Sequence, residues 1–497
     1  MAFTPTSEQV AIVDAARNTT ANLMVSALAG AAKTSTLVLM AEALENQDIL
    51  CLAFNKKIQT EMSERLPTWC TALTLNSFGH RAWGGFLRRR VTIDARKTYN
   101  LIREWLDEHL DDSDLRADFW ENSFDNVKAA IAGAKTAGYI PSTTIASLAV
   151  PFSSLMTDEE FDDWLDLEPT EEEIACIQYV LDKSVRLGLA GTLDYDDQIL
   201  LPTLCKSVSF QRYPIIMIDE AQDLSALNHQ MLWKMSGQGR SRLIAVGDPC
   251  QAIYGFRGAH EDSMPALAQR FAPMTSLSLT ISFRCPTAVV QEARWRAPAM
   301  RWPEWAVQGE IKKLAAWSAK DIPEHATIIC RNNSPLFSMA IALLRNGRYP
   351  EIWGNDLSKY FIKIIKSFGG ADMDMDSANV ALDLWIQREK AKVKDQEKVE
   401  DKAACLRVFL AAPNKTLADA IRQIEDIFNR TGPIKLMTGH KSKGLEFPHV
   451  FILDEQLINK RNPQDKNLLY VMQTRAQETL TYVRSEDFQN NEEPNNG

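Results

Sequence analysis

The strongest constraint on the fold is a series of short apolar runs that end in Gly or acidic residues and alternate with longer helical patterns. This alternation is typical of parallel βαβ units. The runs fall into an early and a late group, which predicts an α/β protein with two parallel sheets. The expected strands are 23–27, 49–54, 215–218 and 243–246 in the early group, and 327–330, 435–438, 449–453 and 479–483 in the late group.

Two charged segments, 91–190 and 356–430, have amphipathic helical patterns and interrupt the two groups. Large aromatic residues are expected to anchor a core in the first segment, namely Trp105, Phe119, Trp120, Phe161 and Trp164. A chain of 497 residues is long enough for several domains. The expected domains are 1–90 with 191–279, 91–190, 280–355 with 431–497, and 356–430.

The composition excludes several classes of protein. Hydrophobic residues make up 45% and charged residues 24%, values that exclude wholesale disorder and collagen-like repeats. We find neither a run of about 18 apolar residues nor a secretory signal. Eight scattered cysteines without metal-ligand spacing predict free thiols in a reducing cytoplasm. The net charge of -10 argues against non-specific coating of nucleic acid, but it is compatible with one basic groove.

A phosphate-binding loop is predicted where MVSALAGAAKTST follows an apolar run and opens a helical pattern. In such a loop, backbone N–H groups cradle the phosphates, a lysine reaches the outer phosphates and a hydroxyl holds magnesium. Lys33 and Thr34 suit the last two roles, and Ala32 stands where the consensus has Gly, so its Cβ is expected to crowd the loop. A helix start rich in small residues is the alternative. The remaining loop residues expected at the phosphates are Ala29, Gly30, Ala31 and Ser35.

The run YPIIMIDEAQDLS predicts the second part of this site. A buried parallel strand would deliver Asp219 and Glu220 at its carboxyl end, where ligands bind in open α/β sheets. One acid can hold hydrated magnesium while the other polarises the attacking water. A strand followed by an acidic helix start is the alternative for this run alone, but it does not explain the presence of GAAKT as well.

Nine segments in a fixed order resemble the motifs of UvrD/Rep-type superfamily 1 DNA helicases, across nearly the whole chain. They are TPTSEQ, ALAGAAKTST, LCLAFNKK, TLNSFG, IDEAQD, VGDPCQAIYGFRGA, ISFRCP, TGHKSKGLEF and LLYVMQTRA. The resemblance implies two RecA-like parallel-sheet motor domains, each with a mainly helical insertion, and ATP with Mg²⁺ in the cleft between them.

The resemblance also implies contacts to the nucleoside. Gln9 resembles the residue that reads adenine, although Thr6 and Gln9 also have the spacing of a helix capping box. Phe283 stands where the family usually has a Tyr that stacks on adenine. Glu446 is similar to the carboxylate that contacts the ribose.

Hydrolysis would depend on further residues that the resemblance identifies. Gln251 is similar to the family residue that senses the γ-phosphate and its water. Arg284 and Arg475 resemble the arginines that reach across from the second domain and neutralise charge in the transition state. Together with Lys33 and Glu220 they are the expected catalytic residues.

A track for single-stranded DNA is implied by aromatic residues beside short polar ones. Such surfaces hold a strand by base stacking and phosphate contacts. Phe256 replaces the Trp most often found in the family, which would keep stacking but with less area. For any one aromatic taken alone, a core position is the alternative. The positions carried over are Phe54, Asn55, Thr74, Ser77, Tyr254, Phe256, Arg257 and His440.

The function predicted is that of an ATP-dependent DNA helicase or single-stranded DNA translocase, and the family branch implies 3′ to 5′ travel. The expected partners are single-stranded DNA and tailed duplex DNA, with replication or repair proteins as candidates and no membrane. The short second insertion favours translocation over duplex unwinding. The expected setting is the cytoplasm of a bacterium or a phage-infected cell.

Two other functions are compatible with the same sequence. The first is a hydrolysis-deficient DNA-binding or scaffold protein derived from a helicase, which Ala32 alone favours. The second is the motor of a helicase–nuclease whose nuclease is a separate subunit, because the chain after the last motif is short.

Overall fold

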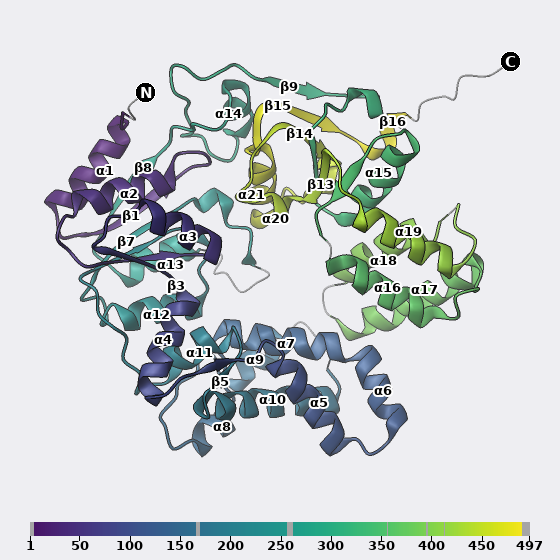
Figure 1. Cartoon of the computed structure of the whole chain (residues 1–497), viewed down its shortest axis with the longest axis horizontal. Helices are drawn as coiled ribbons and strands as arrows, with labels where there is room; N and C mark the ends of the chain where they lie inside the picture. Colours follow the sequence, from purple (N-terminus) through teal and green to yellow (C-terminus); the bar gives the residue numbers. More distant parts are fainter. Residues whose placement is uncertain are drawn as a thin grey trace. The chain divides into compact units, whose positions relative to one another are not determined.

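The structure is a computed structural model that describes residues 4–165, 169–255, 262–354, 356–393, 396–411 and 413–489. The chain divides into two compact units (Figure 1). The first unit comprises Met1–Leu28 and Ala32–Leu279, and the second comprises Ala29–Ala31 and Thr280–Gly497. Each unit contains a six-stranded sheet whose neighbouring strands are all parallel, so the predicted α/β class with two parallel sheets is confirmed.

In the first unit the strand order is β3-β2-β6-β7-β1-β8. The four predicted strands lie at its centre, and two edge strands were not predicted. The centre reads as continuous apolar sequence because helices cover both faces of a parallel sheet, whereas β3 and β8 are half-exposed and partly polar. The bounds are β1 Asn22–Ala27, β2 Ile49–Ala53, β3 Cys70–Thr74, β6 Ile215–Ile218, β7 Arg242–Gly247 and β8 Met274–Leu279.

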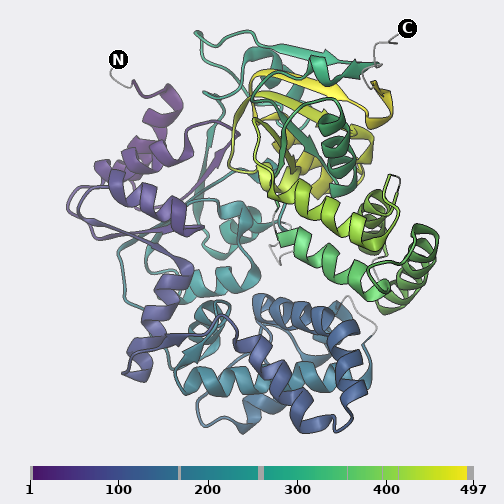
Figure 2. The same cartoon turned by 45° about the vertical axis from the view of Figure 1, so that its right-hand side comes forward.

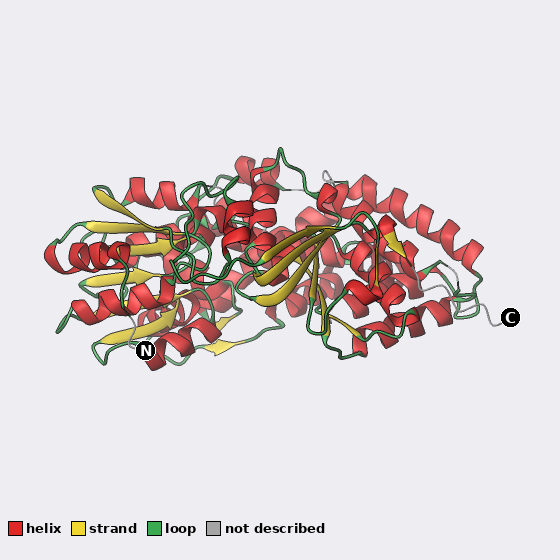
Figure 3. Ribbon diagram, turned by 90° about the horizontal axis from the view of Figure 1, so that it is seen from above, coloured by secondary structure: helices red, strands yellow, loops and turns green. Residues whose placement is uncertain are grey.

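Helices pack along the strands of each sheet (Figure 3). Several begin directly after a strand, and this places their N-termini at the carboxyl edge of the sheet. The helices that pack on the sheet of the first unit are α1 Ser7–Asn18, α2 Lys33–Ala43, α3 Lys56–Arg65, α4 Leu75–Leu87, α11 Asp197–Leu204, α12 Ala226–Met235 and α13 Ser263–Arg270.

A second group of helices in the first unit has its own core (blue in Figure 2). Trp105, Phe119 and Phe161 are buried there as predicted, and Trp120 is half-buried. The prediction for Trp164 was wrong, because its side chain is 44% exposed. The group comprises α5 Lys97–His109, α6 Ser113–Asn122, α7 Phe124–Ala137, α8 Ser142–Ser147, α9 Asp158–Trp164 and α10 Glu171–Leu189, with β4 Thr92–Ile93 paired to β5 Thr192–Leu193.

A buried cluster of charges lies where this helical group meets α11. Lys135 Nζ lies 2.5 Å from Asp194 Oδ2 and 2.9 Å from Asp197 Oδ1. Lys97 Nζ lies 2.6 Å from Asp197 Oδ2. Both lysines and Asp197 are almost inaccessible, so their charges depend on one another. The geometry indicates a structural role for Asp194 and Asp197.

In the second unit the strand order is β12-β13-β11-β14-β15-β9. The four predicted late strands again form the centre, and the unpredicted strands are short edge strands, one of them with the charged sequence EIKK. The bounds are β9 Glu310–Lys313, β11 Thr327–Cys330, β12 Pro350–Ile352, β13 Ile434–Thr438, β14 Phe447–Leu453 and β15 Ala476–Val483.

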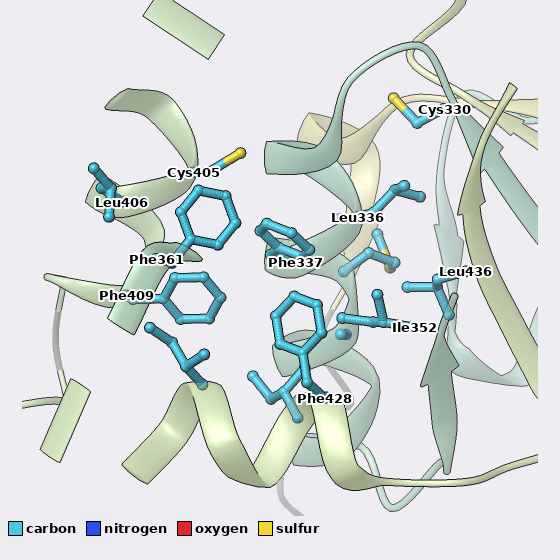
Figure 4. Close-up of a cluster of buried hydrophobic side chains, with 14 of the residues drawn as sticks. Cys330, Leu336, Phe337, Ile352, Phe361, Cys405, Leu406, Phe409, Phe428 and Leu436 are labelled. Atoms are coloured by element: carbon cyan, nitrogen blue, oxygen red, sulfur yellow. The ribbon is translucent and has the colours of Figure 1, made fainter. Parts of the chain in front are cut away.

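Five helices of the second unit, from residue 333 to residue 429, share one core with its sheet. Phe337 of α15 packs against Phe409 and Phe428, with ring centroids 5.4 and 5.3 Å apart (Figure 4). Ile352 and Leu436 reach the same cluster from the strands. The helices of the second unit are α14 Thr287–Ala293, α15 Asn333–Arg345, α16 Asp356–Phe368, α17 Met375–Lys392, α18 Glu397–Phe409, α19 Leu417–Asn429, α20 Gly439–Ser442 and α21 Pro463–Gln473.

All eight cysteines are free, and all but Cys70 are buried. Among the helices of the described segments, none combines the length and the apolar character that crossing a membrane requires.

Candidate functional site

The predicted phosphate loop connects the end of β1 to the start of α2 at Lys33. Gly30 has φ +73° and Ala32 has φ +56°, so two of its residues adopt left-handed backbone. This conformation suits Gly but costs a residue with a Cβ roughly 1–2 kcal/mol. The sequence predicted that the Cβ of Ala32 would crowd the loop, and in the structure its effect is a strained backbone at Ala32. Within the second unit, to which Ala29–Ala31 belong, the Ala29 N–H donates to Tyr470 Oη at 3.0 Å.

The acids of the DEAQ run follow β6 and face this loop. Thr34 Oγ1 donates to Asp219 Oδ2 at 3.4 Å, and Lys33 Nζ lies 3.5 Å from Glu220 Oε1. The structure therefore brings together four residues from two separate motifs. A hydroxyl and a carboxylate on one side of the phosphate loop are the oxygen ligands that Mg²⁺ prefers, so the donor set fits this ion.

Asp219 has an unusual titration. Burial and the neighbouring charge of Glu220 raise the pKa of Asp219 to about 7, although the charge of Lys33 opposes the shift. A bound divalent cation would favour the ionised carboxylate and oppose the effect of burial.

Hydrogen bonds continue from Glu220 to the motif after β7. Gln222 Nε2 donates to Glu220 Oε2 at 2.5 Å, and Gln222 Oε1 accepts from the Asp248 N–H at 2.9 Å. Gln251 Nε2 then donates to Asp248 Oδ2 at 2.7 Å. A Cβ at Gly247 would lie 2.5 Å from Gln222 Oε1, so glycine is required there for this approach. Gln222 and Asp248 were not predicted as site residues, although both lie in motifs that the sequence displays.

Gln9 lies buried beside the same loop. Its side chain accepts from the Thr6 N–H at 3.0 Å, and Thr6 Oγ1 accepts from the Gln9 N–H at 3.2 Å, so the capping box is present. Gln9 Nε2 donates to Thr36 Oγ1 at 3.1 Å. Both ends of the amide therefore have protein partners. Ser35, the residue before Thr36 on α2, accepts a hydrogen bond at 3.0 Å from Arg65.

The first four residues of the predicted DNA track lie at the carboxyl ends of β2 and β3. Phe54 is 45% exposed, and its ring stacks on Tyr254 with centroids 6.2 Å apart. A cavity of about 180 Å³ opens beside this pair and is also lined by Asn76. The three polar residues of this set are all at helix starts: Asn55 and Thr74 cap α3 and α4, and Thr74 Oγ1 lies 2.7 Å from Ser77 Oγ.

Other predicted DNA contacts are spread more widely. His440 lies half-buried in α20 of the second unit. Phe256 and Arg257 lie outside the described residues.

In the second unit two predicted residues pair with each other. Arg284 Nε lies 2.6 Å from Glu446 Oε2, and Gln477 Nε2 donates to the other carboxylate oxygen at 3.1 Å. Phe283 is half-buried and stacks on Trp305, with centroids 6.2 Å apart. Arg284, the predicted catalytic arginine, and Glu446, the predicted ribose contact, are therefore neighbours in the second unit.

Arg475 is almost completely buried, with 1% exposure. Its guanidinium donates to the Val471 and Leu445 carbonyl oxygens at 2.8 and 2.9 Å. In this structure the side chain joins α21 to the segment before β14. No group of three or more His, Cys, Asp or Glu residues suited to a metal ion occurs within the described ranges.

Comparisons with known proteins identify the family. A model of the UvrD/REP helicase N-terminal domain matches residues 7–272, and a model of the UvrD-like helicase C-terminal domain matches residues 433–483. The chain belongs to the UvrD/REP helicase family. The two matched regions contain all the loop, DEAQ and VGDPCQ residues described above.

Individual UvrD/REP relatives are similar at low identity. The F-box DNA helicase protein 1 of Schizosaccharomyces pombe is 24% identical over 96% of this chain and 57% of its own length. The ATP-dependent DNA helicase Rep of Salmonella typhimurium is 31% identical over 21% of this chain and 16% of its own. The RecBCD enzyme subunit RecB of Mycolicibacterium smegmatis is 39% identical over 15% of this chain and 8% of its own. The chain thus spans little more than half of the yeast relative and much less of the other two.

Proposed function

We propose that the protein is an ATP-dependent DNA helicase or single-stranded DNA translocase that moves 3′ to 5′. One observation carries the proposal: the unbroken series of contacts from Lys33 through Glu220, Gln222 and Asp248 to Gln251. This series connects Lys33, which is suited to bind phosphate, to Glu220, which is suited to activate water. It ends at Gln251, which is suited to sense the γ-phosphate. Family membership supports the same activity.

Hydrolysis would use these residues in distinct roles. Lys33 would bind the outer phosphates, and Glu220 would accept the proton of the attacking water, which Gln251 would orient. Thr34 and Asp219 would hold Mg²⁺, whose charge when bound would neutralise the phosphate oxygens. Arg284 would reach the transferred phosphate only after exchanging Glu446 for it, because these two side chains pair in the structure.

The domain assignment belongs to the same proposal. We assign 1–90 with 191–279 and 280–355 with 431–497 as the two motor domains, with ATP in the cleft between them, and 91–190 and 356–430 as the insertions. Phe283 and Glu446 would contact the nucleoside. Adenine reading by Gln9 would require its amide to exchange the capping-box and Thr36 partners described above.

The DNA track would use the stacked pair of exposed Phe54 and half-buried Tyr254 as its platform for bases. A base entering the cavity beside this pair would gain about 1–3 kcal/mol from stacking. The caps at α3 and α4 would bind phosphates of the same strand. These are Asn55, Thr74 and Ser77, with Phe256, Arg257 and His440 as further contacts.

The first test is steady-state ATP hydrolysis with Mg²⁺, with and without a single-stranded DNA oligonucleotide. We expect strong stimulation by DNA and no turnover in Lys33→Ala, which should keep the parent's circular dichroism spectrum and melting temperature. Turnover at the parent rate in Lys33→Ala would show that the site is assigned wrongly. Strand displacement on duplexes with a 3′ or a 5′ tail would then measure polarity and unwinding.

A second candidate is a hydrolysis-deficient DNA-binding or scaffold protein, and the strained Ala32 favours it. It predicts DNA binding without ATP turnover in the same assay. For the setting, we retain the cytoplasm of a bacterium or phage-infected cell as a proposal; the relatives include both bacterial and eukaryotic proteins.

A further inference from the structure

A polar cavity of about 470 Å³ lies beside α4, and none of the described residues that line it belongs to the proposed nucleotide site. It is bounded by α4 and by the segment that follows α11. The two charged groups that line it are Arg81 and Arg88, and the other polar groups are Ser207, Ser209 and Gln211. Among the described residues that line the cavity, none is acidic.

Arg88 occupies a position that normally belongs to Gly. It ends α4 with φ +53° and ψ +35°, which is left-handed backbone. Gly takes this position in many helices because it has no Cβ. The charge of an arginine does favour the C-terminus of a helix, but Arg89 and Arg90 supply the same charge without occupying the strained position.

Gly85 is a glycine inside α4, where another residue would be preferred, whereas Arg88 stands where glycine would be preferred. Gly is costly inside a helix compared with Ala, and here nothing in the structure requires it. A Cβ at Gly85 would meet no atom within 4 Å, and the residue does not have positive φ. Gly79 of the same helix differs, because a Cβ there would lie 1.9 Å from the Gln198 carbonyl oxygen.

The two departures have one explanation in common. Arg81 and Gly85 are spaced i, i+4 on one face of α4, and Arg88, directly after the helix, lines the same cavity. The missing side chain of Gly85 leaves open space between two exposed guanidinium groups, neither of which forms an ion pair with any described residue. Violations of local preference are expected at functional or strained sites.

We propose that this cavity binds phosphate groups of a nucleic-acid strand. Guanidinium groups bind phosphate through paired hydrogen bonds, and serine hydroxyls and a glutamine amide supply further donors. Arg81 and Arg88 are about 10 Å apart along the helix axis, which suits more than one phosphate. Ser77, one turn before Arg81, lies on the same face, so a strand can continue from the proposed DNA track along α4. The identification of nucleic acid as the source of the phosphate groups rests on the proposed function. The inference that the cavity binds an anion does not depend on that function.

The test compares parent, Arg81→Ala and Gly85→Glu for binding to a short oligonucleotide and to one several times longer, without ATP, over a series of salt concentrations. The parent should bind the long strand with a steeper salt dependence than the short one. A variant that binds one phosphate fewer should have a slope smaller by about 0.7 for a single strand. Arg90→Ala is the matched control, because Arg90 is exposed and does not line the cavity.

Stability measurements separate a binding role from a structural one. Gly85→Ala and the control Gly84→Ala should both raise the Tm, by about 2–4 °C, because alanine favours the helix. Only Gly85→Ala should weaken binding of the long strand, since Gly84 does not line the cavity. Arg88→Gly should raise the Tm and weaken binding; a lower Tm with unchanged binding would mean that Arg88 serves the fold.

Three results would overturn the proposal. Equal salt slopes for the parent, Arg81→Ala and Gly85→Glu would exclude a strand at the cavity. A Tm increase with inorganic phosphate or ATP that Gly85→Glu abolishes, without any change in DNA binding, would assign the site to free phosphate instead. Absence of any length-dependent slope in the parent would exclude the extended path. ATP turnover is measured separately in each variant, so a failure of the proposed function appears as absent DNA stimulation in the parent.

Discussion

At the residue scale, two positions of the proposed nucleotide site hold left-handed backbone without glycine. Ala32 has φ +56° and Glu220 has φ +53°. Such residues persist where surrounding contacts fix them. Glu220 has these contacts, because Lys33 and Gln222 both engage its carboxylate. Ala32 has only a methyl group, so the strain at Ala32 must be balanced by the loop as a whole.

Ala32→Gly tests this strain. We expect the free energy of unfolding to rise by up to about 1 kcal/mol, because the left-handed penalty disappears while glycine adds some entropy to the unfolded chain. The measurement is urea denaturation followed by circular dichroism, together with steady-state ATP turnover. A gain in turnover from zero would identify the natural protein as hydrolysis-deficient. A loss of stability would contradict the assignment of strain.

Substitution of Gln222 should separate the positioning of Glu220 from the binding of ATP. In Gln222→Ala, Glu220 and the Asp248 N–H lose their shared partner, so we expect turnover to fall by about 10- to 100-fold, as for other residues that orient catalytic groups. The affinity for a fluorescent ATP analogue should change little, and the pH profile of turnover should shift. The control is Gln269→Ala, on the exposed face of α13. Unchanged turnover in Gln222→Ala would show that the hydrogen bonds from Glu220 through Gln222 to Asp248 do not contribute to hydrolysis.

At the element scale, the buried cluster joins α5, α7 and α11 through charges. Burial alone would raise the pKa of Asp197, but the charges of Lys135 and Lys97 overcome this and hold it below its usual value. Burial alone would lower the pKa of Lys135, but Asp197 and Asp194 hold it above its usual value. The cluster therefore makes the position of the helical group depend on ionisation.

The cluster predicts a pH range for stability. The contribution of Asp197 is complete above its unfolded pKa near 4 and is lost as pH falls. The contribution of Lys135 is complete below about pH 10 and is lost as pH rises. Lys135→Met should lower the free energy of unfolding by about 3–5 kcal/mol at neutral pH, because it leaves buried carboxylates unpaired. Urea titrations across pH measure both effects.

The control for this prediction is Lys128→Met, an exposed lysine on the same helix. It should change stability by no more than about 1 kcal/mol. Equal effects of the two substitutions would show that the buried cluster contributes no specific stability.

At the scale of the whole molecule, the proposed nucleotide residues are divided between the two units. Lys33, Asp219 and Gln251 belong to the first, whereas Arg284 and Glu446 belong to the second. The proposed hydrolysis therefore needs both units, and so does ATP binding to the loop, because Ala29–Ala31 of the loop belong to the second unit.

Arg284→Ala should separate these steps. We expect DNA-stimulated turnover to fall by at least about 10³-fold, the effect of removing an arginine that neutralises the transition state. The affinity for ATP should stay within about tenfold of the parent's. Arg422→Ala, which removes a largely exposed arginine on α19, is the control. A parallel loss of turnover and binding would indicate that Arg284 holds the unit together through Glu446.

Local sequence was sufficient to predict the centre of each sheet. The runs that became β1, β6, β11 and β14 are apolar because both faces of a parallel sheet are covered. The edge strands β3, β8 and β9 were missed because half-exposed strands carry mixed residues, and β12 was missed because it has only three residues. The prediction that Trp164 is buried was wrong because only part of its ring packs against the protein. That part lies close to Gly133, where a Cβ would be 2.5 Å from the ring, and 44% of the side chain is exposed.

The family and the parallel α/β class followed from the amino-acid sequence alone, because motif order and apolar periodicity are local properties. Only the tertiary structure showed that Gln222 and Asp248 link Glu220 to Gln251, that Arg284 pairs with Glu446, and that Gln9 already has partners. Each of these contacts joins side chains from different motifs or depends on one rotamer, and spacing along the chain does not specify which polar groups meet after folding.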